Sequence, residues 1–199
     1  LAKLIKEDSV VGVTTNPIIF ASAISKSDLY RSDILQNKDK SIEEIITKIT
    51  TDDVREACDL FSNTFKESNE IDGRVSLEVD PRFALDPAAT IKQGKELWNI
   101  VDRRNLLIKV PGTIEGLPAV TELIAQGISV NITLIFSIDR YKKVLDAFAS
   151  GLEKRVEKSQ DISNVHSVAS FFISRIDVEV DTQLDNQPDL KGLAAIANA

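Results

Sequence analysis

The feature that most constrains the fold is a repeated alternation of short apolar runs with longer amphipathic segments. The apolar runs are rich in β-branched residues and bounded by turn residues, which predicts strands at Ser9–Thr15, Arg74–Val79, Leu106–Val110, Ile128–Phe136 and Val165–Ile173. Apolar residues recur every three or four positions in the other segments, which predicts helices over Lys38–Phe65, Pro87–Val101, Leu117–Ala125 and Asp139–Lys158, and from Val178 onward. Repeated strand–helix units predict an α/β fold in which helices cover a parallel sheet.

Two architectures satisfy this pattern, an open doubly wound sheet and a closed (β/α)₈ TIM barrel. No Gly-x-Gly-x-x-Gly segment follows a predicted strand, which disfavours the dinucleotide-binding form of the open sheet. A complete barrel takes about 250 residues, whereas this chain has 199, starts at Leu1 and contains no methionine. We therefore expect one barrel-like domain over residues 1–199 that is incomplete and belongs to a longer polypeptide.

Composition excludes several classes of function. The net charge of -7 argues against a general nucleic-acid binder, although a local basic pocket for one sugar phosphate remains compatible with it. No apolar run is long enough to cross a membrane, and no signal peptide is visible. A single cysteine, Cys58, cannot form an internal disulfide and suits the reducing cytoplasm, where we expect the protein. The single His166 rules out an all-histidine metal site, and a homo-oligomer is left open.

Lys109 is the first of several polar residues in strands that should be almost wholly apolar. It ends the apolar run Leu106-Leu107-Ile108 near the carboxyl end of its predicted strand, the end that forms the active-site face of barrels. Partial burial disfavours the charged form of a lysine, and a neutral amine can form an imine with a ketone. The alternative is a lysine whose ammonium reaches from the strand end to solvent.

Glu78 and Asn16 are expected at the same edge. A carboxylate at the end of a strand can hold a water molecule and move protons, but Glu78 could instead form an ion pair with Lys109 or Arg82. Asn16 precedes Pro17, a combination that commonly marks a turn, and it follows the first predicted strand.

Asn131 and Thr133 lie two residues apart in one strand, so both side chains should point to the same face. Burying an amide and a hydroxyl is costly unless they bind each other, water or a substrate. A satisfied internal network and a substrate site are therefore both open.

Ser170 and Arg175 lie near the end of the last predicted strand, where a hydroxyl and an arginine can clasp a phosphate. The alternative pairs Arg175 with Asp177 or Glu179. A lysine, a carboxylate, amides, hydroxyls and an arginine on one rim suit carbonyl chemistry on a phosphorylated polyhydroxy substrate.

Several segments resemble, in the right order, the signature segments of transaldolases, and the resemblance runs from about Ile5 to the C-terminus. They are Gly12–Phe20 (GVTTNPIIF), Leu107–Thr113 (LIKVPGT) followed by Glu115-Gly-Leu, and Val130–Ser137 (VNITLIFS). Val168–Asp181 looks like the longer bacterial branch of that family, some members of which are fused to a phosphoglucose isomerase.

The resemblance implies a (β/α)₈ barrel and a role for each candidate residue. Lys109 would be the Schiff-base lysine, and Glu78 would hold the catalytic water with Thr133 as its partner. The remaining residues would bind substrate: Asn16 and Asn131 the hydroxyls of a dihydroxyacetone unit, Ser170 and Arg175 the phosphate. No metal or organic cofactor is implied.

The implied reaction, in the pentose phosphate pathway, moves a dihydroxyacetone unit from a ketose phosphate (sedoheptulose 7-phosphate or fructose 6-phosphate) to an aldose phosphate (glyceraldehyde 3-phosphate or erythrose 4-phosphate). One departure stands out, because the family's acid/base aspartate lies on a first strand that would precede Leu1. The last two strands of the barrel would likewise follow Ala199. Two alternatives remain: a fructose-6-phosphate-type aldolase of the same superfamily, and a non-catalytic barrel fragment that binds sugar phosphates.

Overall fold

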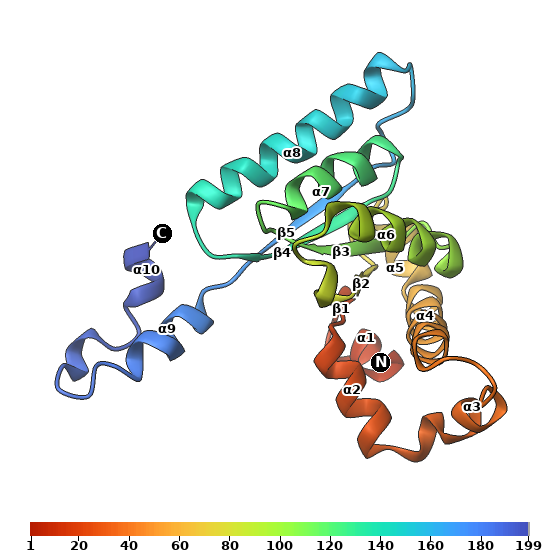
Figure 1. Ribbon diagram of the computed structural model, residues 1–199, viewed down its shortest axis with the longest axis horizontal. Coiled ribbons are helices and arrows are strands. Elements are labelled where there is room, and N and C mark those ends of the chain that lie inside the picture. Colours follow the sequence, from red (N-terminus) through yellow and green to blue (C-terminus); the bar gives the residue numbers. More distant parts are fainter. Residues whose placement is uncertain (199) are drawn as a thin grey trace. The chain divides into compact units, whose positions relative to one another are not determined.

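The computed structural model describes residues 1–198, and its backbone is shown in Figure 1. The chain divides into two compact units. The first comprises residues 1–81 and 92–109, and the second comprises residues 82–91 and 110–198. Each unit is described by itself.

The first unit contains three strands that pair in parallel and in chain order, β1 (Gly12–Thr14), β2 (Arg74–Glu78) and the first four residues of β3 (Leu106–Pro111). Its helices are α1 (Ala2–Glu7), α2 (Pro17–Lys26), η1 (Asp28–Tyr30), α3 (Arg31–Gln36), α4 (Ile42–Leu60), α5 (Ser62–Glu67) and most of α6 (Pro87–Val101). The short helix η2 (Pro81–Phe83) spans the boundary between the units. The pairing of β2 with β3 sets Glu78, the last residue of β2, beside Lys109, which lies two residues before the end of β3.

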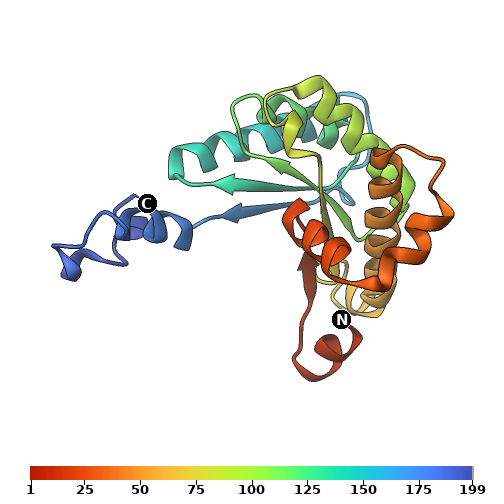
Figure 2. The ribbon, with the colours of Figure 1, turned by 60° about the horizontal axis from the view of Figure 1, so that its bottom comes forward.

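The second unit contains β4 (Val130–Ile135) and β5 (Ser167–Phe171), which run parallel to each other as Figure 2 shows. Its helices are α7 (Gly116–Ala125), α8 (Ile138–Glu157), α9 (Ser174–Asp181), η3 (Pro188–Leu190) and α10 (Ala194–Asn198). Helices α7 and α8 lie side by side (Figure 1), while α9 and α10 follow the carboxyl end of β5.

The close packing of α7 on α8 depends on Gly151. A Cβ atom at this position would lie 2.6 Å from Cβ of Ile124 and 2.8 Å from the carbonyl oxygen of Thr121. The Thr121 hydroxyl also donates a hydrogen bond to the carbonyl of Ala147 across the two helices, at 2.9 Å. A residue without a side chain therefore sets how near the two helices approach each other.

The helix predicted over Lys38–Phe65 is wrong in its continuity. A capping box at Ser41 and Glu44 begins α4, which ends before Phe61, and α5 follows. The backbone of Phe61 departs from helical geometry (φ -86°, ψ 0°), yet its side chain is fully buried, as Phe65 is nearly so. Apolar spacing continues across the break, so periodicity alone cannot detect it.

The helix predicted from Val178 onward is wrong in its extent, since α9 begins at Ser174 and ends at Asp181. Turns and η3 follow before α10. Carboxylates of α9 bind the returning backbone: the amide of Ala195 donates to Asp177 and that of Gly192 donates to Asp181, both at 2.9 Å.

Parallel strands alternate with helices in both units, which confirms the α/β class and the arrangement of an incomplete (β/α) barrel. The helices found within residues 1–198 include none with the length and hydropathy of a membrane span.

Candidate active site

Lys109 and Glu78 form a buried ion pair near the carboxyl ends of β3 and β2. The ammonium nitrogen Nζ lies 3.2 Å from Oε2 of Glu78, and the two side chains are 8% and 10% exposed. Lys109 therefore does not reach out to solvent, which excludes the alternative considered from the sequence. The ion pair considered for Glu78 is present, and it brings a proton acceptor within reach of the lysine nitrogen.

A main-chain carbonyl completes the surroundings of the lysine nitrogen. Nζ of Lys109 donates to the carbonyl oxygen of Thr15 at 3.2 Å, while the Thr15 hydroxyl donates to the carbonyl of Ser76 at 2.8 Å. Sequence reasoning missed Thr15 as a partner, because the contact uses its main-chain carbonyl, a group that every residue has. The segment between β1 and α2 thus helps to hold Lys109 in place.

Asn16 begins α2 as its N-cap. Its side-chain oxygen accepts a hydrogen bond from the amide of Ile19 at 2.9 Å, a common way to satisfy the first turn of a helix. The turn suggested by Asn16-Pro17 is therefore a helix start. Within residues 1–198, the Nδ2 amide of Asn16 donates no hydrogen bond.

β4 carries a β-bulge where the candidate residue Thr133 lies. Ile132 pairs with Ala169 but Ile135 pairs with Phe171, so two residues of β4 stand opposite one residue of β5. Leu134, one of the two residues in the bulge, has a left-handed backbone with φ 60°, which is unfavourable for a leucine. Sequence reasoning missed this bulge, because leucine is not a residue that marks one.

The hydroxyl of Thr133 is buried and has no hydrogen-bond partner within the described part of the chain. Its carbonyl, in contrast, accepts a hydrogen bond from the amide of Gly112 at 2.7 Å. A buried hydroxyl without a partner costs free energy, so it is a position where a water molecule or substrate would be stabilised.

Asn131 and Ser170 bind each other across β4 and β5. The Ser170 hydroxyl donates to Oδ1 of Asn131 at 2.8 Å, and Asn131 is 3% exposed. The internal network considered for Asn131 is therefore partly present, although it does not include a bond from Thr133.

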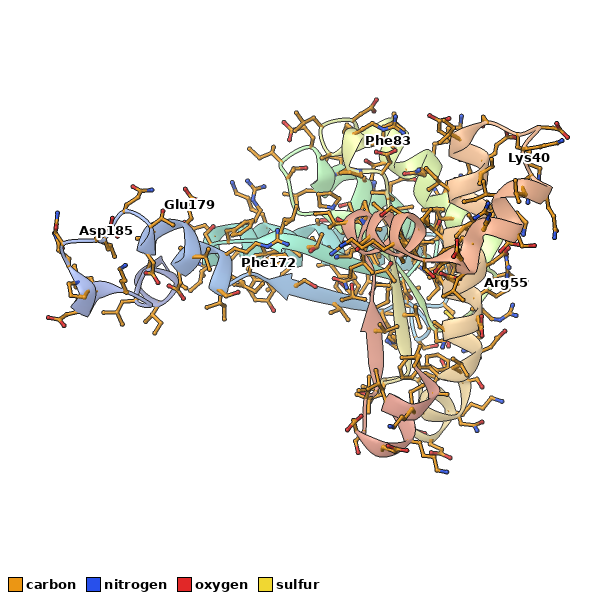
Figure 3. All side chains as sticks on the ribbon, turned by 90° about the horizontal axis from the view of Figure 1, so that it is seen from below. Lys40, Arg55, Phe83, Phe172, Glu179 and Asp185 are labelled. Atoms are coloured by element: carbon orange, nitrogen blue, oxygen red, sulfur yellow. The ribbon has the colours of Figure 1, made fainter. Side chains whose placement is uncertain are left out.

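Arg175 lies in the first turn of α9 and is exposed. Within residues 1–198 it forms no ion pair, so the predicted alternative of a bond to Asp177 or Glu179 is wrong. Its guanidinium carbon lies instead 4.4 Å from the centroid of the Phe172 ring. Figure 3 shows Phe172 where β5 leads into α9.

The structure pairs Lys109 with Glu78 and Asn131 with Ser170, and the candidate residues divide between the two units. Asn16, Glu78 and Lys109 belong to the first unit; Asn131, Thr133, Ser170 and Arg175 belong to the second. The single rim expected from the sequence stays a prediction. Residues 1–198 contain no cluster of three or more histidine, cysteine, aspartate or glutamate side chains that could hold a metal ion.

Comparisons with known proteins cover the whole chain. The sequence model of the family described as "Transaldolase/Fructose-6-phosphate aldolase" matches residues 1–199. Proteins named "Transaldolase" from Mycolicibacterium smegmatis and Frankia alni are each 52% identical to the chain over 206 aligned residues, and one from Kocuria rhizophila is 49% identical. These alignments include 100% of this chain but only 56% of each relative, so the chain spans about half the length of the curated relatives it matches.

Proposed function

Because this chain belongs to the transaldolase/fructose-6-phosphate aldolase family, we propose that it supplies the Schiff-base lysine and the substrate-binding residues of a transaldolase. The observation that carries the proposal is the buried pair of Lys109 and Glu78, whose Nζ and Oε2 atoms lie 3.2 Å apart. A buried amine next to a proton acceptor is what imine formation with a ketone requires.

In the proposed first half-reaction, Glu78 takes a proton from the ammonium group of Lys109. The free electron pair of Nζ then attacks the carbonyl carbon of a ketose phosphate. The resulting hydroxyl leaves as water after it receives a proton, which gives an iminium ion. The bond between C3 and C4 breaks, its electrons move toward the iminium nitrogen, and the proton of the C4 hydroxyl passes to a base. An aldose phosphate is released and a three-carbon enamine remains on Lys109.

In the second half-reaction, the enamine carbon attacks the aldehyde carbon of an aldose phosphate, and the aldehyde oxygen gains a proton. Water then adds to the new iminium ion and frees the product ketose from Lys109. We assign to Glu78 and Thr133 the binding of this water, because the Thr133 hydroxyl is buried without a partner.

Four further residues are proposed to bind the substrate. The amides of Asn16 and Asn131 donate to hydroxyls of the dihydroxyacetone unit, while Ser170 and Arg175 bind the phosphate. The guanidinium of Arg175 supports this role, since no carboxylate within residues 1–198 neutralises it. An arginine and a hydroxyl together suit the charge and the acceptors of a phosphate group.

The chain is proposed to act within a longer polypeptide, because the relatives that it matches extend well beyond the aligned part. That polypeptide, called the complete polypeptide below, would form a single transaldolase barrel in the cytoplasm. It would also supply the base that receives the C4 hydroxyl proton.

The experiment that tests the proposal is trapping of the covalent intermediate. The complete polypeptide is incubated with fructose 6-phosphate, reduced with borohydride, digested and analysed by mass spectrometry. We expect a three-carbon adduct on Lys109 that is lost in Lys109→Ala and retained in Lys92→Ala, since Lys92 is an exposed lysine of α6. Labelling of another lysine, or no labelling at all, would overturn the assignment.

The family description also includes aldolases that act on fructose 6-phosphate, and these would use the same lysine. The two activities differ in the fate of the enamine: an aldolase protonates it and releases dihydroxyacetone, whereas a transaldolase transfers it. With erythrose 4-phosphate as acceptor, we expect sedoheptulose 7-phosphate to exceed free dihydroxyacetone. The reverse ratio would favour the aldolase.

A further inference from the structure

An aromatic stack underlies the guanidinium of Arg175 and has no part in the function proposed above. The Phe172 ring lies 4.4 Å from the guanidinium carbon, and the Phe136 ring lies against Phe172 with centroids 5.6 Å apart and planes inclined by 21°. Both distances fall within the ranges for favourable cation–π and stacked aromatic contacts. Phe136 directly follows β4, Phe172 directly follows β5, and Arg175 lies in α9, so the stack ties three segments of one unit together.

The Phe172 ring contacts the guanidinium without accepting any of its N–H hydrogen bonds. Hydrogen bonds from an arginine run along the edge, in the plane of the group, whereas a ring contacts its face. Within residues 1–198, no acceptor receives a hydrogen bond from Arg175. The nearest acidic neighbour along α9, Asp177, accepts a hydrogen bond from the amide of Ala195 at 2.9 Å and forms no ion pair with Arg175 within residues 1–198.

A long exposed side chain normally samples many rotamers, and ordering it on a ligand costs free energy. A ring below the guanidinium lowers that cost in advance, because it favours one placement of the group before a ligand arrives. The hydrogen-bond donors stay free for the phosphate.

We infer that Phe172, supported by Phe136, is a positioning residue that holds the Arg175 guanidinium in place for a substrate phosphate. This inference rests on the phosphate-binding role proposed for Arg175. It predicts a specific defect when the ring is lost: weaker binding of phosphate with little change in the chemical step.

The test compares Phe172→Leu with Phe171→Leu in the complete polypeptide. Phe171 is a matched control, since it is also half-buried at the end of β5 but has no ring or cation contact within the described residues. The measured quantities are the KM and kcat for fructose 6-phosphate and the inhibition constant of inorganic phosphate. Inorganic phosphate reports on the phosphate site without any turnover.

We expect Phe172→Leu to raise both the KM and the phosphate inhibition constant about two- to fivefold, the factor typical of an exposed cation–π contact. Phe136→Leu should raise them about twofold, because the stacked pair is weakened but the cation–π contact remains. The kcat of each variant, and all constants of Phe171→Leu, should stay within about twofold of the parent.

A second series uses the Arg175→Ala background. Arg175→Ala alone should raise the KM and the inhibition constant about tenfold or more, because charge-assisted hydrogen bonds to phosphate are lost. Phe172→Leu should then add no further effect, since the group that it positions is absent.

The outcomes separate the two claims. If Arg175→Ala leaves both constants unchanged, the proposed phosphate role fails and the inference fails with it. If Arg175→Ala has its effect but Phe172→Leu matches Phe171→Leu, or acts equally without Arg175, only the positioning role of Phe172 is overturned. Borohydride trapping on Lys109 in each variant verifies that the remainder of the site is intact.

Discussion

Removing one charge of the buried pair of Lys109 and Glu78 should lower the free energy of unfolding far more than removing both charges. The charged atoms lie 3.2 Å apart and the side chains are 8% and 10% exposed, so water screens them little. At an effective dielectric constant of about 20, two unit charges at this distance attract each other by about 5 kcal/mol. Glu78→Gln would leave the ammonium without a negative charge beside it, with neutral acceptors such as the Thr15 carbonyl in its place.

The expected magnitudes follow from the cost of an unpaired buried charge. Glu78→Gln and Lys109→Met should each lower the free energy of unfolding by about 3–5 kcal/mol. The double variant removes both charges and should lose only about 1–2 kcal/mol, because no charge is left buried without a counter-charge. The coupling free energy between the two positions should thus be about 4 kcal/mol or more.

The assay is urea unfolding of the complete polypeptide and its three variants, followed by circular dichroism and extrapolated to water. Lys142 and Asp139 provide the matched control, since their charged atoms lie 3.4 Å apart but the side chains are 69% and 90% exposed. Lys142→Met and Asp139→Asn should couple by less than about 0.5 kcal/mol. Additive effects at Lys109 and Glu78 would refute the buried pair and the proton transfer built on it.

Three further predictions concern the framework around the site. Gly151→Ala should lower the free energy of unfolding by about 1–2 kcal/mol in urea melts, because the new methyl group would overlap Ile124; an unchanged or higher stability would contradict the close packing of α7 on α8. Leu134→Ile keeps the side-chain volume but branches at Cβ, so the left-handed backbone, φ 60°, should make it less stable by about 1 kcal/mol; equal midpoints in the same melts would argue against the bulge. Burial raises the pKa of Cys58 to about 12 from its usual 9.0, so peptide mapping after iodoacetamide treatment at pH 8 should find the thiol unmodified in the folded protein and modified in urea. Since the folded pKa is the higher one, Cys58 contributes stability below pH 9 that declines as the pH rises toward 12, and alkylation of the folded protein at the unfolded rate would contradict its burial.

Local patterns in the sequence predicted much of the fold. The spacing of apolar residues placed all five strands found in residues 1–198 and gave the bounds of α6 as observed. Such spacing is a local property, because each strand or helix must bury one face whatever its neighbours are. The same locality explains the errors, since apolar spacing continues through the break at Phe61 and cannot show where α9 ends.

The chemical character of the candidate site was also visible in the sequence, because a lysine or an amide inside an apolar strand requires a partner. Which partner it finds depends on residues far away along the chain. Glu78 meets Lys109 because β2 and β3 pair in one register, and a shift by one residue would turn one side chain to the opposite face. The choice between an ion pair and exposure to solvent was therefore made by tertiary pairing.

The sequence by itself determined the order of strands and helices and the residues able to do carbonyl chemistry, since both follow from the side chains present at each position. Tertiary structure alone decided the left-handed backbone of Leu134, the carbonyl of Thr15 that faces Lys109, and the ring of Phe172 beneath Arg175. These features use backbone atoms, or contacts between segments that only packing brings together, and no residue type at a single position encodes them.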